Sequence, residues 1–171
     1  QMCIRDSAYY YRYDARHLCI EKKLPGAQPV YYVYDKTGRL MFSQDGNQHT
    51  TGEWTFYLYD KFQRLTVQGI CKNTNTASAV SVIIKCERSN TNTGLENSGY
   101  SSTFSLTSPE VHLVNYYDDY EFKVLSGFNN SKFTTAFSTA NQGYVKGYPA
   151  GSITKVPGSN TKLYSVNFYD I

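Results

Sequence analysis

The sequence predicts an all-β protein built from antiparallel hairpins, and three observations support this prediction. The chain of 171 residues contains 17 tyrosines and nine phenylalanines, and such residues fit pleated, half-buried strand surfaces. A Tyr-x-Tyr-Asp string, followed by Arg-Leu or a degenerate form of it, recurs along the chain. No segment longer than about two turns shows an apolar pattern with the period of a helix.

The clearest hairpin is the stretch VYYVYDKTGRLMF at residues 30–42. Asp35 and Gly38 occupy the first and fourth positions of a type I turn, where Asp accepts hydrogen bonds from backbone amides and Gly adopts positive φ. A short loop with a left-handed Gly is a common hairpin connection, so a second strand is expected to follow and to stop at 45–47. The repeat residues of this copy are Tyr32, Tyr34, Asp35, Gly38, Arg39 and Leu40.

Decayed copies of this hairpin lie on both sides of it, with Tyr-Asp pairs beginning at positions 13, 34 and 59. Such spacing lies in the range of structural repeats, with length differences absorbed in loops such as 45–53. The earlier copy retains Tyr11, Tyr13 and Asp14 but has His17 at the Gly position. The later copy retains Tyr57, Tyr59, Asp60, Arg64 and Leu65, and has Gln63 there. Both hairpins are expected to persist, either with more strain than the turn at Gly38 or with a different turn type.

Two further places echo the pattern and suggest four segments. A degenerate fourth copy includes Tyr117 and Asp118, and the first half of a fifth includes Tyr169 and Asp170. We expect repeat hairpins over 8–73, a polar loop or insertion with a short strand over 74–111, and further strands over 112–171 that end within a truncated repeat. The strand in the insertion is expected in the apolar run AVSVIIKC at 79–86.

The two ends of the chain suggest a piece of something longer. Residues 1–7, QMCIRDS, have no apolar core and do not join the pattern, so they are expected to be a leader foreign to the natural protein. The missing secretory signal therefore says nothing about compartment. An array that stops within a repeat leaves an open strand edge, so the chain is expected to be an internal segment.

Composition argues against several classes of function. The net charge of +3 is scattered and forms no basic stripe, which argues against nucleic-acid binding. No apolar run approaches the roughly 18–20 residues of a membrane span. The cysteines show neither a C-x-x-C pattern nor histidines at metal-ligand spacing, so buried free thiols and no metal or cofactor are expected. They are Cys3, Cys19, Cys71 and Cys86.

The sequence also argues against an enzyme. The three histidines fall in a turn, a polar loop and a strand start, without a carboxylate partner suggested by spacing: His17, His49 and His112. The aspartates of the repeat share one position, so capping of the turn explains them all: Asp14, Asp35 and Asp60. The pair Asp118-Asp119 also falls on that position. No nucleophile elbow, phosphate loop or Cys-His pair is present. We expect no catalytic residue.

The tyrosine stripes leave two interpretations open. Cross-strand aromatic pairs hold neighbouring hairpins together, at about 0.2–1 kcal/mol each. Surface aromatics could instead stack on sugar rings, which would make the chain a carbohydrate- or surface-binding adhesin module. The residues concerned are Tyr32, Tyr34, Tyr57 and Tyr59. A further hypothesis is that Arg39 and Arg64 each pair with a carboxylate or carbonyl of a neighbouring repeat.

The string Tyr-x-Tyr-Asp-x-x-Gly-Arg-Leu at 32–40 resembles the YD repeat of the Rhs family. The run RYDARHLCIEKKLPGAQPVYYVYDKTGRLMFSQDGNQ at 12–48 is similar to longer Rhs-like surface proteins of Bacteroidetes. The segment KGYPAGSITKVPGSNTKLYSVNFYDI at 146–171 resembles a later part of the same proteins. The similarity covers roughly residues 9–73 and 112–171, and residues 74–111 match no pattern of the family.

The resemblance implies a structural function. In this family, YD hairpins join edge to edge into a curved, spiralling sheet that closes as a hollow shell, often around a C-terminal toxin domain. By resemblance, the chain would be a non-catalytic part of the wall of a secreted or surface-attached bacterial protein. Its partners would be adjacent repeats of the same polypeptide and an encapsulated toxin domain. Under the alternative interpretation they would include cell-surface glycans.

Overall fold

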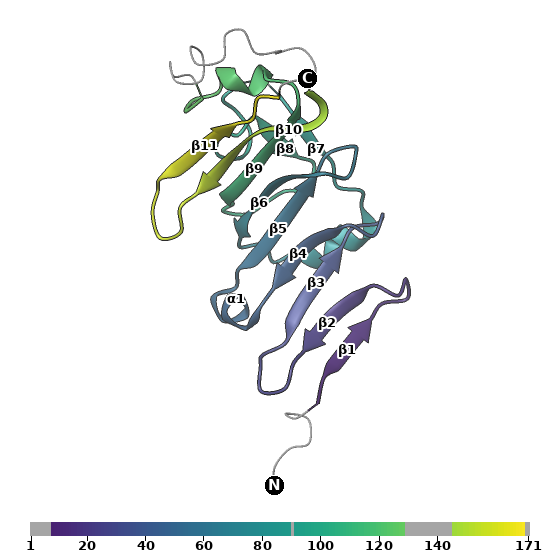
Figure 1. Cartoon of the computed structure of the whole chain (residues 1–171). Coiled ribbons are helices and arrows are strands. Elements are labelled where there is room, and N and C mark those ends of the chain that lie inside the picture. Colours follow the sequence, from purple (N-terminus) through teal and green to yellow (C-terminus); the bar gives the residue numbers. More distant parts are fainter. Residues whose placement is uncertain (1–7, 90, 129–144, 170–171) are drawn as a thin grey trace. The chain divides into compact units, whose positions relative to one another are not determined.

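The computed structural model describes residues 8–89, 91–128 and 145–169 (Figure 1). Its contacts divide the chain into two compact units. The first unit comprises the residues up to Tyr57 together with 70–84 and 104–108, and the second comprises 58–69, 85–103 and the residues from 109 onward. No helix among the described residues is long and apolar enough to cross a membrane.

The predicted all-β fold of antiparallel hairpins is confirmed. The strands form a nine-stranded sheet in the order β1-β2-β3-β4-β5-β6-β9-β10-β11 and a separate pair, β7-β8. In the first unit the strands are β1 (Tyr10–Tyr13), β2 (Cys19–Lys23), β3 (Val30–Tyr34) and β4 (Leu40–Gln44). Two strands have residues in both units, β5 (Trp54–Tyr59) and β6 (Leu65–Cys71). The second unit holds β7 (Cys86–Arg88), β8 (Tyr100–Ser102), β9 (Glu110–Asp118), β10 (Val145–Lys155) and β11 (Lys162–Val166).

The first two hairpins close in the same way. Tyr13 pairs with Cys19 in the β1-β2 hairpin, and Tyr34 pairs with Leu40 in the β3-β4 hairpin. In both, the register shifts by one residue immediately before this pair. Such a bulge follows a short turn whose last residue is left-handed, so one turn chemistry explains both closures.

The segment expected to be a polar loop at 45–53 instead contains a short helix, α1 (Gly46–Thr51). Asp45 caps its first turn by accepting a hydrogen bond from the Gln48 amide, and the Gln48 side chain accepts one from the Asp45 amide. This reciprocal capping box satisfies two backbone donors that a loop would leave to water. The helix ends at Gly52, which has a φ of +70°.

The strand expected in the apolar run 79–86 is placed differently by the structure. Thr76–Ser81 forms a 3-10 helix, η2, and the first strand of this region is β7, which begins at Cys86. Ala79 and Ile84 are buried, whereas Val82 and Ile83 are exposed. The run is therefore anchored by its buried apolar side chains and by single hydrogen bonds, such as that from the Lys36 amide to the Val82 carbonyl, rather than by a strand ladder. Strand β7 pairs with β8, so the insertion contains a strand pair of its own.

Each unit has its own aromatic core. In the first unit, the buried Phe42 ring contacts the rings of Trp54 and Phe104 at centroid distances of 6.4 and 5.5 Å. In the second unit, the buried Tyr116 ring stacks on Tyr100 at 5.6 Å and on Phe122 at 4.5 Å. The second unit also contains two short 3-10 helices, η3 (Leu95–Asn97) and η4 (Glu121–Val124). Aromatic pairs of this kind contribute about 0.5–1.5 kcal/mol each beyond their buried area.

Candidate functional site

Three turns of the repeat share one hydrogen-bond pattern. Asp14, Asp35 and Asp60 each accept, on Oδ1, the backbone amides two and four residues later, at 2.8–3.0 Å. The amide of each aspartate donates to the carbonyl four residues later, at 2.9–3.0 Å. Its own carbonyl accepts the amide three residues later, at 3.0–3.1 Å. The aspartate therefore holds all three turns by the same four backbone contacts.

The residue three positions after each aspartate is left-handed in all three turns. Gly38 has a φ of +83°, His17 of +62° and Gln63 of +65°. This conformation costs a non-glycine residue about 1–2 kcal/mol. The two turns that lost glycine thus keep the geometry of the third rather than changing turn type.

The second carboxylate oxygen of each aspartate accepts a guanidinium. Arg39 Nε lies 3.0 Å from Asp35 Oδ2, and Arg64 Nε lies 2.7 Å from Asp60 Oδ2. In the first copy Leu18 stands at the arginine position, and Arg16 donates to Asp14 Oδ2 at 3.0 Å instead. A guanidinium therefore accompanies every one of these turns, although its sequence position changes.

In the first unit the arginines also reach beyond their own turn. Arg16 Nη1 donates to the Asp35 carbonyl at 2.7 Å, and so links the turn of one repeat to the turn of the next. Arg39 Nη2 donates to the Ile84 carbonyl at 2.5 Å. Arg39 thus contacts a carbonyl of the insertion.

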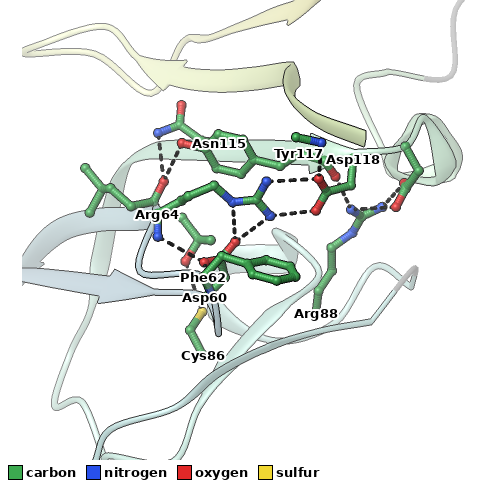
Figure 2. A network of polar contacts seen from close by, with 12 residues as sticks. Asp60, Phe62, Arg64, Cys86, Arg88, Asn115, Tyr117 and Asp118 are labelled. Atoms are coloured by element: carbon green, nitrogen blue, oxygen red, sulfur yellow. Dashed lines mark hydrogen bonds and ion pairs between the residues drawn. The ribbon is translucent and has the colours of Figure 1, made fainter. Parts of the chain in front are cut away.

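In the second unit Arg64 joins two aspartates. Figure 2 shows its guanidinium between the carboxylates of Asp60 and Asp118. Its two terminal nitrogens donate to the two oxygens of Asp118, at 2.9 and 2.5 Å, in a bidentate pair. The same guanidinium lies 4.3 Å from the centroid of the Tyr117 ring, and the Tyr117 hydroxyl donates to the Leu65 carbonyl. Here an arginine does pair with a carboxylate of the next copy.

The charges in these turns shift the pKa values of their groups. Hydrogen bonds from Arg64 lower the pKa of Asp118 to about 2, against the opposing effect of partial burial. The same contacts raise the pKa of Arg64. Asp35 is fully buried, and burial alone would raise its pKa, but hydrogen bonds from Thr37 and Arg39 hold that pKa below its usual value. The ionised form of Asp35 is therefore stabilised within its own turn, and that of Asp118 by the arginine of the preceding copy.

In the fourth copy, one of the turn contacts is made by Asp119, one residue later than the sequence suggests. Asp119 accepts the Glu121 amide on Oδ1 at 2.9 Å, which is the first of the turn contacts made by the other aspartates. Arg88 supplies its guanidinium, at 2.5 Å from Asp119 Oδ1. Asp118, the expected turn residue, is itself left-handed with a φ of +75°, and accepts both Arg64 and the Gly147 amide. Asp119 thus binds the backbone amide of the turn, and Asp118 binds the arginine of the preceding copy.

The strand tyrosines of the repeat mostly serve internal contacts. The Tyr34 hydroxyl donates to the Cys19 carbonyl at 3.0 Å, and the Tyr57 and Ser43 hydroxyls lie 3.1 Å apart. In the fifth copy, the Tyr169 hydroxyl donates to the Pro149 carbonyl at 2.7 Å. Asp170 lies outside the described residues. The remaining repeat positions are strand or strand-flanking residues: Tyr11 and Tyr13, which are exposed, and Tyr32, Leu40, Tyr59 and Leu65, which are half-buried.

The histidines and cysteines lie in different local environments. His17 lies exposed in its turn, and His112 Nε2 lies 3.2 Å from Glu110. Cys19, Cys71 and Cys86 are free thiols. Burial raises the pKa of the Cys71 and Cys86 thiols to about 11, so both are protonated near neutral pH. Within the part of the chain that the structure describes, no group of His, Cys, Asp or Glu side chains could hold a metal ion.

A groove of about 500 Å³ lies in the first unit. Its aromatic lining comes from Tyr31, Tyr32, Tyr34 and Trp54, together with the imidazole of His49. Its polar lining includes Arg12, Asp14, Arg16 and Gln44, and residues of η2 form part of its wall: Thr76, Ala77 and Val80. The sequence names Tyr32 and Tyr34 as candidates for sugar binding, but it does not predict Tyr31 and His49 as part of this groove, because Tyr31 alternates with the repeat tyrosines and His49 falls in an expected polar loop.

No protein-family model matches the chain, and no curated protein matches it.

Proposed function

We propose that the chain is a non-catalytic structural segment of a YD-repeat shell of the Rhs type. The shell would enclose or display a C-terminal toxin or effector domain in a secreted or surface-attached bacterial protein. The observation that carries the proposal is the shared hydrogen-bond pattern of the turns at Asp14, Asp35 and Asp60. The pattern persists where glycine and arginine have been lost from their positions, which is typical of a unit retained for its shape.

The use of the charged groups supports the same proposal. Each turn aspartate already accepts two backbone amides and a guanidinium, so its lone pairs serve the turn. Asp35 accepts a further hydrogen bond from the Thr37 hydroxyl and is fully buried. Carboxylates engaged in this way stabilise backbone geometry, and a buried charge stays favourable only when it is paired and hydrogen-bonded. Repetition of such pairs serves to hold successive hairpins in one arrangement.

The test uses the natural protein in which this sequence occurs. Cryo-electron microscopy is expected to show a hollow β shell whose wall includes these hairpins. Limited proteolysis is expected to leave an enclosed domain intact in the wild type and to degrade it when Arg64→Ala breaks the link between Asp60 and Asp118. Glu87→Gln, at an exposed strand position, is the matched control. In this variant the enclosed domain is expected to resist proteolysis as it does in the wild type. A solid particle without an interior would refute the proposal.

The groove favours a second candidate function, carbohydrate binding. The sequence indicates Tyr32 and Tyr34 for this role, and both line the groove, although the Tyr34 hydroxyl donates to a carbonyl inside the sheet. If these tyrosines form the site, Tyr32→Ala abolishes binding on a glycan array while the thermal melt is unchanged. If binding persists in Tyr32→Ala and is lost on substitution of His49 or Arg12, the sugar lies against the part of the groove around these two residues.

A further inference from the structure

Much of the groove lining in the first unit comes from one face of several strands, and Ile20, Tyr32 and Tyr34 add to it from alternating positions. Across the strand ladder, Arg12 lies opposite Glu21, Glu21 opposite Tyr31, and Tyr31 opposite Gln44. Residues directly opposite one another in antiparallel strands project from the same face of a sheet. The next strand contributes Trp54 to the lining of the same groove. The groove therefore lies on a sheet face, where the backbone hydrogen bonds are already made.

The aromatic walls of the groove are held by packing. The Trp54 ring stands edge-on to the buried ring of Phe42, with an angle of 81° between their planes. The Tyr31 ring lies 5.8 Å from the imidazole of His49, which α1 brings over the strands. Rings fixed in this way offer flat apolar faces without losing much rotational freedom on binding. Such faces complement the C–H surface of a pyranose ring.

The hydrogen bonds around Gln44 determine the tautomer of His49. Gln44 is buried, and its Nε2 donates to the Glu53 carbonyl at 2.8 Å, which fixes the orientation of the amide. Its Oε1 then accepts from His49 Nδ1 at 3.1 Å. Neutral His49 therefore carries its proton on Nδ1, and its Nε2 remains as an acceptor, by assignment from the hydrogen-bond pattern. An acceptor beside an aromatic face suits a sugar hydroxyl.

The charges that line the groove are nearly balanced. Arg12 Nε is paired with Glu21 at 2.9 Å, and Arg16 Nε is paired with Asp14 at 3.0 Å. Both terminal nitrogens of Arg12 have no partner among the described residues, so they keep N–H donors for a ligand. Because each guanidinium already faces a carboxylate, the groove has little net attraction for an anion. A neutral ligand with several hydroxyls fits these donors and acceptors better than an acidic one.

We propose that this groove binds a neutral hexopyranose unit of a glycan. The ring would lie against Tyr31 and Trp54, one hydroxyl would donate to His49 Nε2, and another would accept from Arg12. A volume of about 500 Å³ falls within the range of roughly 300–1,000 Å³ that small-molecule sites occupy. The proposal rests on the carbohydrate-binding candidate and is independent of the shell. An extended peptide is a poorer match, because it would add its hydrogen bonds at a strand edge and not on a sheet face.

Trp54 is the only tryptophan of the chain, so its fluorescence reports on the groove alone. The experiment titrates the full chain with the neutral disaccharides cellobiose, maltose, lactose and chitobiose. At least one of them is expected to change the Trp54 emission saturably. His49→Ala and Arg12→Ala are each expected to weaken that binding about tenfold, which corresponds to about 1.4 kcal/mol. His49→Gln keeps an acceptor oxygen and is expected to restore most of the affinity.

Control variants and probes separate the outcomes. His112→Ala, in β9 of the second unit, is expected to bind like the wild type. Thermal melts establish that His49→Ala and Arg12→Ala remain folded, as expected for exposed side chains. The proposal is overturned if none of the neutral sugars changes the emission, if only glucuronic acid or sialyllactose does, or if His49→Ala and His49→Gln bind alike. Protease protection by a shell is unaffected by these variants, so failure here leaves the shell proposal standing.

Discussion

At the scale of single residues, the left-handed position of the turn shows how much sequence change the repeat tolerates. Gly38, His17 and Gln63 adopt closely similar φ values although only glycine does so without steric cost. The surrounding contacts, above all those of the turn aspartate, impose the conformation on whichever residue stands there. The turn geometry is therefore fixed by the aspartate, and the glycine only makes it easier to form.

The first prediction concerns Gln63→Gly. A left-handed residue costs about 1–2 kcal/mol, and glycine loses about 0.5–1 kcal/mol more backbone entropy on folding. Gln63→Gly is therefore expected to stabilise the chain by about 0.5–1 kcal/mol in urea unfolding, with an unchanged m-value. Gln68→Gly, within β6, is the control and is expected to destabilise. A loss of stability on Gln63→Gly would show that its side chain makes contacts worth more than the strain.

The second prediction concerns the acid side of the stability curve. The pKa of Asp118 is lowered to about 2, below the unfolded value of about 3.9, so the ionised carboxylate stabilises the folded state. That stabilisation is fully present above the unfolded pKa and is lost as pH falls through the folded pKa, which places the loss between about pH 4 and pH 2.

Asp118→Asn tests this window directly. The variant is expected to be less stable than the wild type near neutral pH, and the difference is expected to shrink as pH falls from about 4 to 2. Glu87→Gln serves as the control at an exposed position. Urea unfolding measured at several pH values gives the comparison. A constant difference between Asp118→Asn and wild type across this range would contradict the assigned role of the Arg64 contact.

At the scale of elements, the hairpins could be predicted from the sequence and the connections between them only in part. The hairpin around Asp35 follows from local turn chemistry, which needs no distant contact. The sequence does not predict the helix α1, although Asp45 and Gln48 have capping-box spacing, because the three turn-forming residues at 45–47 favour a loop. The apolar run at 79–86 has no period that separates a strand from a short helix.

Other features depend on contacts that sequence spacing does not contain. Asp119 accepts the Glu121 amide in the fourth copy, and its guanidinium partner Arg88 comes from the inserted strand β7. The Asn73 side chain likewise donates to the Ser105 carbonyl and accepts the Thr107 amide, which ties the two ends of the insertion together. Long-range partners of this kind become visible only when the chain is folded.

The third prediction concerns the contact between a hairpin and the insertion. Arg39 binds the fully buried Asp35 and also the Ile84 carbonyl, and its own side chain is only 15% exposed. Arg39→Ala leaves a buried carboxylate without its cation, so it is expected to cost about 3 kcal/mol, at the lower end of values for buried pairs. Urea unfolding, with the thermal melt as a second measure, gives the difference.

Arg12→Ala is the matched control for Arg39→Ala. Arg12 also pairs with a carboxylate, that of Glu21, but its side chain is 53% exposed. Exposed pairs contribute about 0–1 kcal/mol, so this variant is expected to melt close to the wild type. Equal effects of the two substitutions would show that burial of Asp35 does not govern the strength of the pair.

At the scale of the whole molecule, the strand order leaves β1 as the first strand among those the structure describes. Its tyrosines Tyr10, Tyr11 and Tyr13 are all exposed, at 45–57%. An exposed strand edge presents unpaired backbone N–H and C=O groups and readily adds another strand. In a YD-repeat shell this edge is where an adjacent repeat would pair, which is the partner we propose for the chain.

The fourth prediction is that this edge makes the isolated chain self-associate. Sedimentation velocity is expected to show a weight-average sedimentation coefficient that rises with concentration. Tyr11→Lys places a charge on the edge strand, a substitution that natural sheets use to block pairing, and is expected to lower the association. Tyr148→Lys changes an equally exposed tyrosine within β10, which has β9 and β11 on its two sides, and is expected to associate like the wild type. If both variants sediment alike, the association uses another surface, and β1 is not the edge that receives a neighbouring repeat.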